Sequence, residues 1–139
     1  MAFIDKTDLN RYLEDDTTDQ LTDSNDTIVD EAILDALDRV REKISPRFDM
    51  VTELAKVGVA RNRSLMKHSI NLAIYFLFQR LYTNVIPEGR VLAMEEAEKW
   101  LDDVYKGRLN VDLEKNDEDA EEGWPIRWGS APKKGNQSF

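Results

Sequence analysis

The chain has 139 residues, of which 28 are Asp or Glu and 19 are Lys or Arg, so its formal net charge is −9; this length supports one domain with one core. The absence of cysteine excludes disulfide frameworks, thiol nucleophiles and cysteine-ligated zinc, and the single histidine, His68, weakens any proposal of a His-rich metal site or a Ser-His-Asp triad. The acidity argues against nucleic acid as the main partner, and without a signal-peptide pattern or an apolar run of ~20 residues we expect a soluble cytoplasmic protein with no membrane partner.

Hydrophobic periodicity predicts helices through most of the chain, and hence an all-α fold. A short first helix is expected over Thr7–Glu14, followed by a loop rich in Asp and Thr. The second helix is expected to begin at Asp26 or Thr27 and to end before Pro46. Its apolar stripe is Ile33, Leu37, Val40 and Ile44. The segment 50–60 is ambiguous and allows a short helix that breaks at its glycine.

The third predicted helix, Ser64–Thr83, is apolar on every face over residues 72–78. Such a helix is buried on all sides, inside a bundle or between subunits, and in so short a chain the other elements cannot easily cover it alone. We therefore expect its aromatic side chains to lie in the core or in an oligomer contact: Tyr75, Phe76, Phe78 and Tyr82. A fourth helix is expected over Glu88–Lys106, opened by Pro87 and ended by Gly107 in the left-handed conformation.

The composition changes after Val111, which predicts three parts: a helical domain over 1–111, a flexible acidic linker over 112–123 and a tail over 124–139. Seven linker residues are acidic and almost none is apolar, so the linker cannot bury enough surface to order itself. The tail holds the residue types that anchor interfaces. We predict that it binds a partner, with folding back onto the bundle as the alternative, through Trp124, Ile126, Arg127, Trp128, Lys133, Lys134 and Phe139.

Few residues suggest chemistry. Three oxygen-bearing side chains are spaced as at the start of an EF-hand loop: Asp23, Asn25 and Thr27. Ile28 stands where that loop needs glycine and Leu34 where it needs the bidentate Glu, so a helix cap with an Asx-turn is favoured over calcium. His68 is expected to be a surface or packing residue. We predict no catalytic residue, no metal site, no cofactor and no small-molecule substrate.

Charge alternates along the chain, with acidic segments at 1–60 and 91–123 and basic segments at 61–90 and 124–139. Solvation explains this pattern, and so does complementary self-association, in which a basic segment of one subunit meets an acidic segment of its neighbour. One basic cluster could contact DNA phosphates: Arg61, Arg63 and Lys67. The alternative is pairing with the acidic first half of the same or a neighbouring chain.

Several stretches together resemble a known family. They are FIDKTDLNRYL, QLTD, DEAILDALDRVREKISPRF, SINLAIYFLFQRLY and EEAEKWLDDVYKGRLNVDL, within residues 3–113. This order resembles the small helical head–tail connector (adaptor or head-completion) proteins of tailed phages, in particular the Mu-like prophage branch. Arg47 and Phe48 fit the family's Arg-aromatic pair after the acidic helix, and Gly107, between Lys106 and Arg108, fits its lysine-glycine turn.

The resemblance implies a four-helix subunit of the virion that forms a homo-oligomeric ring beneath the portal, joins capsid to tail and has no enzymatic activity. Its implied partners are copies of itself, the portal protein and a tail-side completion protein, with transient contact to passing DNA; its location is the virion and, during assembly, the host cytoplasm. The prolines that the family often has after the Arg-aromatic pair are absent from 49–60. The residues alone also allow an acidic, non-enzymatic regulatory module that sequesters a basic partner or mimics the charge of DNA.

Overall fold

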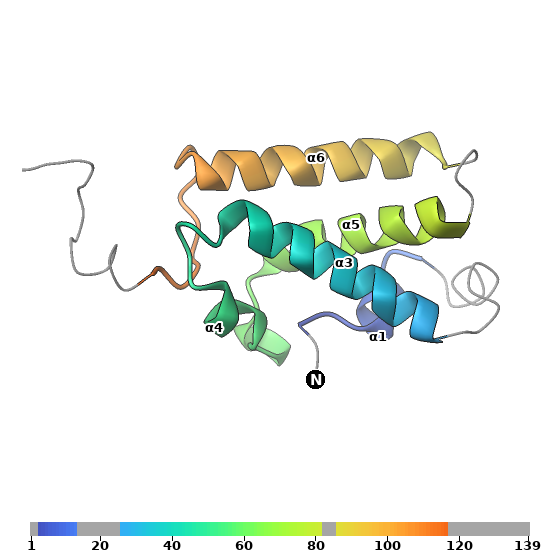
Figure 1. Ribbon diagram of the computed structural model, residues 1–139, viewed down its shortest axis with the longest axis horizontal. Helices are drawn as coiled ribbons and strands as arrows, with labels where there is room; N and C mark the ends of the chain where they lie inside the picture. Colours follow the sequence, from blue (N-terminus) through green and yellow to red (C-terminus); the bar gives the residue numbers. More distant parts are fainter. Residues whose placement is uncertain (1–2, 14–25, 82–85, 117–139) are drawn as a thin grey trace, which may run out of the picture.

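The computed structural model describes residues 3–13, 26–81 and 86–116. In these ranges the secondary structure is helical: α1 (Lys6–Leu9), α3 (Asp26–Ile44), α4 (Met50–Leu54), the 3₁₀ helix η1 (Gly58–Ala60), α5 (Arg63–Leu81) and α6 (Glu88–Tyr105). The predicted all-α bundle is confirmed. Figure 1 shows the three long helices α3, α5 and α6, with α3 crossing α5 and with the short α1 and α4 below them. None of the described helices has the length and apolar character needed to cross a lipid bilayer.

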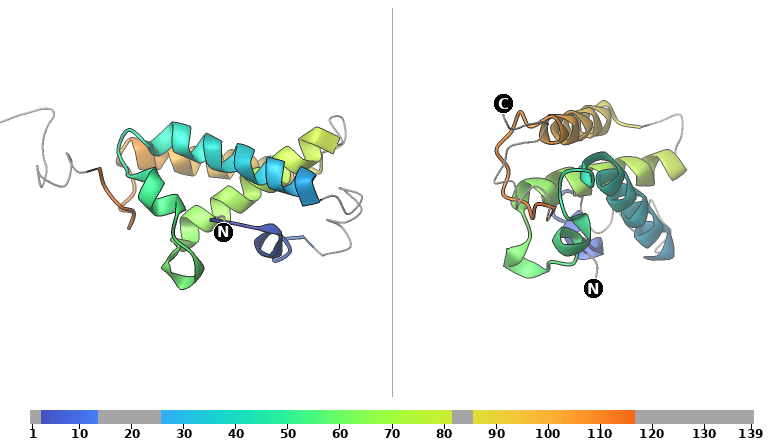
Figure 2. Two further views of the ribbon diagram at one scale, coloured as in Figure 1. Left: turned by 60° about the horizontal axis from the view of Figure 1, so that its bottom comes forward. Right: turned by 60° about the vertical axis from the view of Figure 1, so that its left-hand side comes forward.

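Helix α5 is the centre of the bundle. It packs against α3, α6 and α1, and Figure 2 shows α3 and α6 on two sides of it. Its inner residues are fully buried: Leu72, Ala73, Ile74 and Leu77. The predicted stripe of α3 is buried as well, as are Ala97, Leu101 and Val104 of α6. Each fully buried Leu or Ile contributes about 1.5–3 kcal/mol relative to an exposed one, so this three-helix contact supplies most of the hydrophobic stabilisation.

The predicted ends of the long helices agree with the structure to within one or two residues. Asn62 caps the start of α5, because its side-chain Oδ1 accepts a hydrogen bond from the Leu65 N–H at 2.9 Å. Gly107 ends α6 with a φ of 76°, in the left-handed region where only glycine is free of strain. The predicted end of the third helix at Thr83 lies outside the described residues.

The first helix is shorter than Thr7–Glu14 and begins one residue earlier. Asp5 and Asp8 form a reciprocal capping box, each side chain accepting the other's backbone N–H at 3.1 Å, which fixes the start of α1 at Lys6. The N–H of Asn10 then bonds the carbonyls of Lys6 and Asp8, and the helix ends after Leu9. The periodic pattern located this element but not its caps.

Residues 112–116, here called the strap, correct the predicted domain boundary. The sequence assigned them to the flexible linker, yet Leu113 is buried and Lys115 forms an antiparallel β-bridge with Phe48. The Glu114 carbonyl accepts the N–H of Asp49 at 2.8 Å, just before α4. Backbone hydrogen bonds, which composition does not reveal, therefore extend the folded unit through Asn116, and the rest of the predicted linker lies outside the described residues.

A buried carboxylate holds the strap to α4. Glu53 has no exposed surface, and its Oε2 accepts the Glu114 N–H at 3.0 Å and pairs with Lys56 Nζ at 3.1 Å. The second oxygen, Oε1, has no hydrogen-bond partner. The acid at this position thus gives the Glu114 N–H its acceptor and is the nearer of two carboxylates that pair with Lys56.

We expect Glu53→Ala to destabilise the protein by about 1–3 kcal/mol, because it leaves a partly buried N–H without an acceptor and removes the nearer of the two carboxylates that pair with Lys56. Glu53→Gln keeps a carbonyl oxygen for the Glu114 N–H and should cost clearly less. Urea unfolding measures both, with exposed Val51→Ala as the control, and hydrogen exchange at the Glu114 amide should rise in the Ala variant. Equal losses for Gln and Ala would contradict the role of the acceptor.

Candidate functional site

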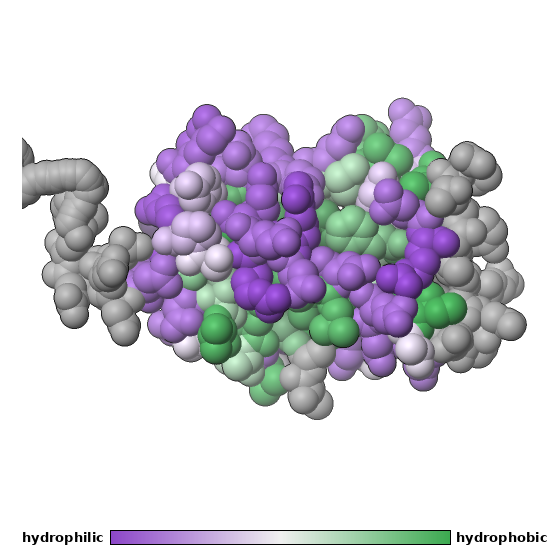
Figure 3. Space-filling model, in the orientation of Figure 1, coloured by the Kyte–Doolittle hydropathy of each residue, from purple (hydrophilic) through white to green (hydrophobic). Residues whose placement is uncertain are grey.

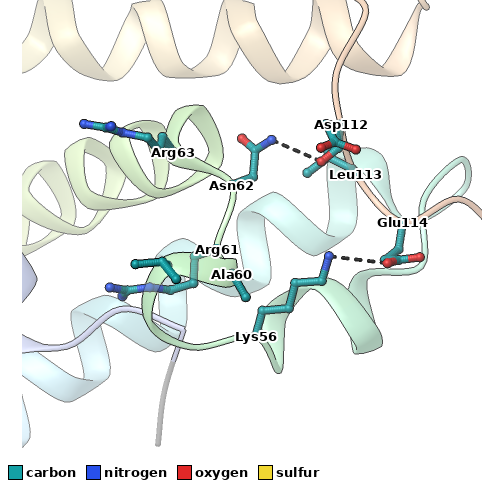
Figure 4. A pocket seen from close by; sticks show the side chains of 9 residues that line it. Lys56, Ala60, Arg61, Asn62, Arg63, Asp112, Leu113 and Glu114 are labelled. Atoms are coloured by element: carbon teal, nitrogen blue, oxygen red, sulfur yellow. Dashed lines mark hydrogen bonds and ion pairs between the residues drawn. The ribbon is translucent and has the colours of Figure 1, made fainter.

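A polar cleft of about 360 Å³, the strap cleft, lies where α4, η1 and the start of α5 meet the strap. Figure 4 shows it from close by. It is lined by Lys56, Val59, Ala60, Arg61, Asn62, Arg63, Asp112, Leu113 and Glu114. It contains two of the three cations of the predicted basic cluster, so it is the first place to look for a binding site.

Most polar groups of the strap cleft already bind one another. In Figure 4 the Lys56 side chain points to Glu114, with Nζ 3.4 Å from Oε1, and Asn62 Nδ2 donates to the Asp112 carbonyl at 3.1 Å. Hydrogen bonds to Glu53 and Glu114 raise the pKa of Lys56 above its ordinary value, Glu53 being the larger cause. The charged residues of the cleft therefore hold the strap to the bundle, and few of their hydrogen-bond donors are left to bind a ligand.

The structure separates the predicted basic cluster. The Arg61 guanidinium is largely buried and donates to Asp8 Oδ2 at 2.9 Å and to the Phe3 carbonyl at 2.8 Å. Lys67 pairs with Glu96 of α6 at 3.5 Å. Arg63 is exposed, has no hydrogen bond or ion pair with another described residue, and reaches away from Lys56 in Figure 4. Two of the three cations thus pair within the chain: Arg61 with the acidic first half, which was the alternative to DNA contact, and Lys67 with the second acidic segment.

His68 is a packing residue. Its ring is buried and stacks on Trp100 of α6, with ring centroids 4.8 Å apart and planes 28° from parallel. Burial lowers the pKa of His68, the neighbouring charge of Lys67 lowers it further, and Glu96 opposes this only in part. The imidazole is therefore neutral at pH 7 in the folded protein.

Asp103 of α6 also forms hydrogen bonds within the chain. Asp103 is buried, and its two oxygens accept hydrogen bonds from Lys99 and Arg108, each at 2.9 Å. These bonds hold the pKa of Asp103 below its ordinary value, the Lys99 bond being the larger cause. Within the described ranges, no group of three or more His, Asp or Glu side chains is placed to hold a metal ion.

The remaining predicted site residues fall into two sets. Tyr75, Phe76 and Phe78 are half-buried, with Tyr75 and Phe76 in edge contact at 6.0 Å between centroids, so the chain itself covers them only in part. Tyr82, the calcium-like residues Asp23 and Asn25, and the whole tail from Trp124 to Phe139 lie outside the described residues.

Sequence reasoning missed an exposed apolar surface on α4 and η1. Val51 is 80% exposed, Val57 is about half exposed and Val59 is fully exposed; we call these three residues the valine corner. Figure 3 shows apolar surface along the lower edge of the molecule, where α4 and η1 lie in Figure 1. The sequence could have indicated this exposure. The three valines occupy a short segment with neither helical nor strand periodicity, so no common face of it is expected to be buried.

Comparison with known proteins gives one family. Residues 3–127 match the family model described as Bacteriophage Mu, Gp36. The matched region contains every described helix and the strap, and continues through the acidic segment to Arg127. No curated protein matches the sequence. The match confirms the predicted resemblance to Mu-like phage proteins.

We expect the free energy of unfolding to fall as the pH drops below about 6.5, the ordinary pKa of histidine. The pKa of His68 is lower in the folded state, so the unfolded chain takes up the proton first and gains free energy from it. The loss should continue down to the folded-state pKa, with a slope of at most about 1.4 kcal/mol per pH unit.

Urea unfolding at several pH values between about 7.5 and 5.5, the range in which histidine titrates, measures this dependence. His68→Phe keeps a ring against Trp100 and should be nearly independent of pH in this window, because the chain has no other histidine. An equal slope in the wild-type protein and the variant would show that His68 is not the cause.

Proposed function

Because the chain belongs to the bacteriophage Mu Gp36 family, we propose that it is a structural subunit of the phage particle that acts as a head–tail connector. In this proposal copies of the chain form a ring beneath the portal and join the capsid to the tail. Its partners are the neighbouring copies, the portal protein and a tail-side completion protein, and passing DNA makes only transient contact. It acts in the virion and, during assembly, in the host cytoplasm.

The observation that carries this proposal is the valine corner. Three exposed β-branched side chains within nine residues of one short segment gain nothing in a monomer, and a concentration of exposed apolar residues is typical of an interaction site. The left-hand view of Figure 2 shows α4 and η1 extending below the long helices, so a partner can approach them from outside. A ring needs such a surface, since each subunit presents one patch to one neighbour.

The described polar groups also favour an assembly protein over an enzyme. His68 is buried and neutral, and Asp103 and Glu53 are held by neighbouring cations. These residues support the fold rather than facing a substrate. Together with membership of a phage family and the all-helical fold, this argues against enzymatic activity.

The acidic regulatory module gains less support. Mimicry of DNA needs a row of carboxylates that are free to bind cations, whereas Glu31 and Asp35 of α3 both pair with Arg80, and Asp38 pairs with Arg41. The acidic face of α3 is thus partly neutralised by the chain itself.

Replacing Val51 and Val59 together by Asp should leave folding almost unchanged, because both side chains are exposed and Asp is favourable in the first turn of α4. We expect the variant to keep its helix content and melting temperature, yet to be missing from purified particles, with heads and tails left unjoined. Circular dichroism, electron microscopy and mass spectrometry of particles made with the variant measure this.

The matched control is Leu34→Asp with Leu92→Asp, which changes two exposed apolar residues on α3 and α6 by the same charge. This control should enter particles normally. Normal particles with the Val51/Val59 variant would overturn the proposed role of the valine corner, and particles whose heads and tails join without the protein would overturn the proposed function.

A further inference from the structure

We propose that a cation-lined pocket at the end of α6 binds the acidic segment 117–122 of a neighbouring copy of this chain. The proposal rests on the assembly of copies proposed above and names the contact between them. The pocket, here called the basic pocket, has a volume of about 350 Å³ and lies between the α3–α4 turn, the residues after α6 and the strap. Its main lining residues are Arg47, Arg108, Lys115, Phe48, Leu109 and Val111, and no carboxylate lines it.

Two of its cations are held in place by the bundle. Arg47 Nη1 donates to the Tyr105 carbonyl at 3.2 Å, at the negative end of α6, and its guanidinium lies 5.7 Å from the centroid of the Phe48 ring. Glycine at residue 107 makes room for this side chain, because a Cβ there would lie 2.8 Å from Arg47 Nη1. Arg108 is oriented by two carboxylates that pair with it, Asp103 at 2.9 Å and Asp102 at 3.7 Å. These contacts hold the side chains of Arg47 and Arg108 in place before any ligand binds.

The third cation, Lys115, has no partner among the described residues. The Lys115 side chain is exposed and makes no hydrogen bond or ion pair with another described residue. The strap carries it to the pocket, since Lys115 forms the β-bridge with Phe48. The basic pocket therefore combines three positive charges, one of them free, with an apolar wall, and it fits a segment that carries several carboxylates beside an apolar side chain.

The chain contains one such segment. Residues 117–122 read DEDAEE, with five carboxylates in six residues, and Trp124 follows two residues later. The segment begins directly after Asn116, whose side chain donates to the carbonyls of Ser45 and Pro46, each at 3.1 Å. Figure 1 shows the last described residues of the strap running outward from the end of the bundle.

This exit favours a neighbouring copy as the binding partner. A segment that starts from an outer end of one subunit is placed to reach the next, whereas binding to its own pocket would require the chain to turn back at once beside its anchor. One basic pocket and one acidic segment for each copy also allow every copy in a ring to use both, which is a heterologous contact that repeats and closes.

Disulfide trapping on the full chain tests the proposal. The native sequence has no cysteine, so each variant carries a single thiol. A chain with Asn110→Cys, an exposed residue of the basic pocket, is mixed with a size-tagged chain with Glu118→Cys under mild oxidation. We expect the mixed disulfide to form about tenfold faster than in the matched pair Gln79→Cys with Glu118→Cys, because binding raises the local concentration of the two thiols. Equal rates in the two pairs would overturn the proposal.

Charge reversal then tests whether the contact is electrostatic. Lys115→Glu in the Asn110→Cys chain should reduce the rate to that of the control pair, and Asp117→Lys with Asp119→Lys in the tagged partner should restore it. Arg63→Glu, which reverses an exposed cation outside the basic pocket, should leave the rate unchanged. A rate that does not respond to Lys115→Glu would overturn binding between copies. A chain that carries both Asn110→Cys and Glu118→Cys serves as a further control, and a disulfide that forms only within that chain would overturn it too. Duplex DNA binding that is lost in Lys115→Glu would assign the pocket to phosphates instead and overturn it as well.

The two proposals fail separately. If the protein joins heads to tails and the mixed disulfide forms no faster than in the control, only the contact through the basic pocket is wrong. If the mixed disulfide forms as expected but particles join without the protein, the contact between copies stands and the connector function is wrong.

Discussion

The burial of α5 between α3, α6 and α1 is the constraint on which the rest of the structure depends. Residues 72–78 are apolar on nearly every face, so the helix gains most when other helices surround it. Each covering helix contributes only one apolar stripe, and the opposite sides of α3 and α6 are left to charged residues. Arg39 of α3 binds Glu98 of α6 through two hydrogen bonds of 2.8 and 2.9 Å. Such half-exposed ion pairs contribute little stability, but they favour one alignment of the helices.

A small bundle with one central helix leaves its ends open, and the chain closes them with polar contacts. Arg61 ties the segment before α1 to the start of η1 through the carbonyls of Phe3 and Gly58 and the carboxylate of Asp8. Close to it, across the strap cleft, Glu53 holds the strap to α4. Many charged residues of this acidic protein are therefore structural. The surfaces that remain for partners are small and distinct: the valine corner, exposed Arg63 and the basic pocket.

In the proposed function, the valine corner and the basic pocket would give the protein its specificity for partners. An apolar corner supplies binding energy through the burial of surface, whereas a charged pocket facing an acidic segment supplies orientation and selects the partner. The strap lies between the two, since it covers the bundle beside α4 and places Lys115 in the basic pocket at the end of α6. In the proposed assembly, folding and contact between copies would use neighbouring parts of the same segment.

The sequence by itself determined the elements whose signals are local and periodic. The stripe of α3, the apolar run of α5 and the left-handed Gly107 were all predictable, because each depends on residues within one or two helical turns. The resemblance of the helices to Mu-like phage proteins was predictable for the same reason, and residues 3–127 confirm it.

Only the tertiary structure decided what depends on residues far apart in the chain. The cations Arg61, Arg63 and Lys67 are close in sequence, yet their roles differ because Asp8 and Glu96 approach two of them from other elements. Residues 112–116 have the composition of a flexible linker, but the carboxylate of Glu53 and the backbone of residues 47–49 supply the hydrogen bonds that order them. The composition of a segment indicates how much apolar surface that segment can bury. It does not indicate which hydrogen-bond partners from distant residues lie beside the segment in the folded protein.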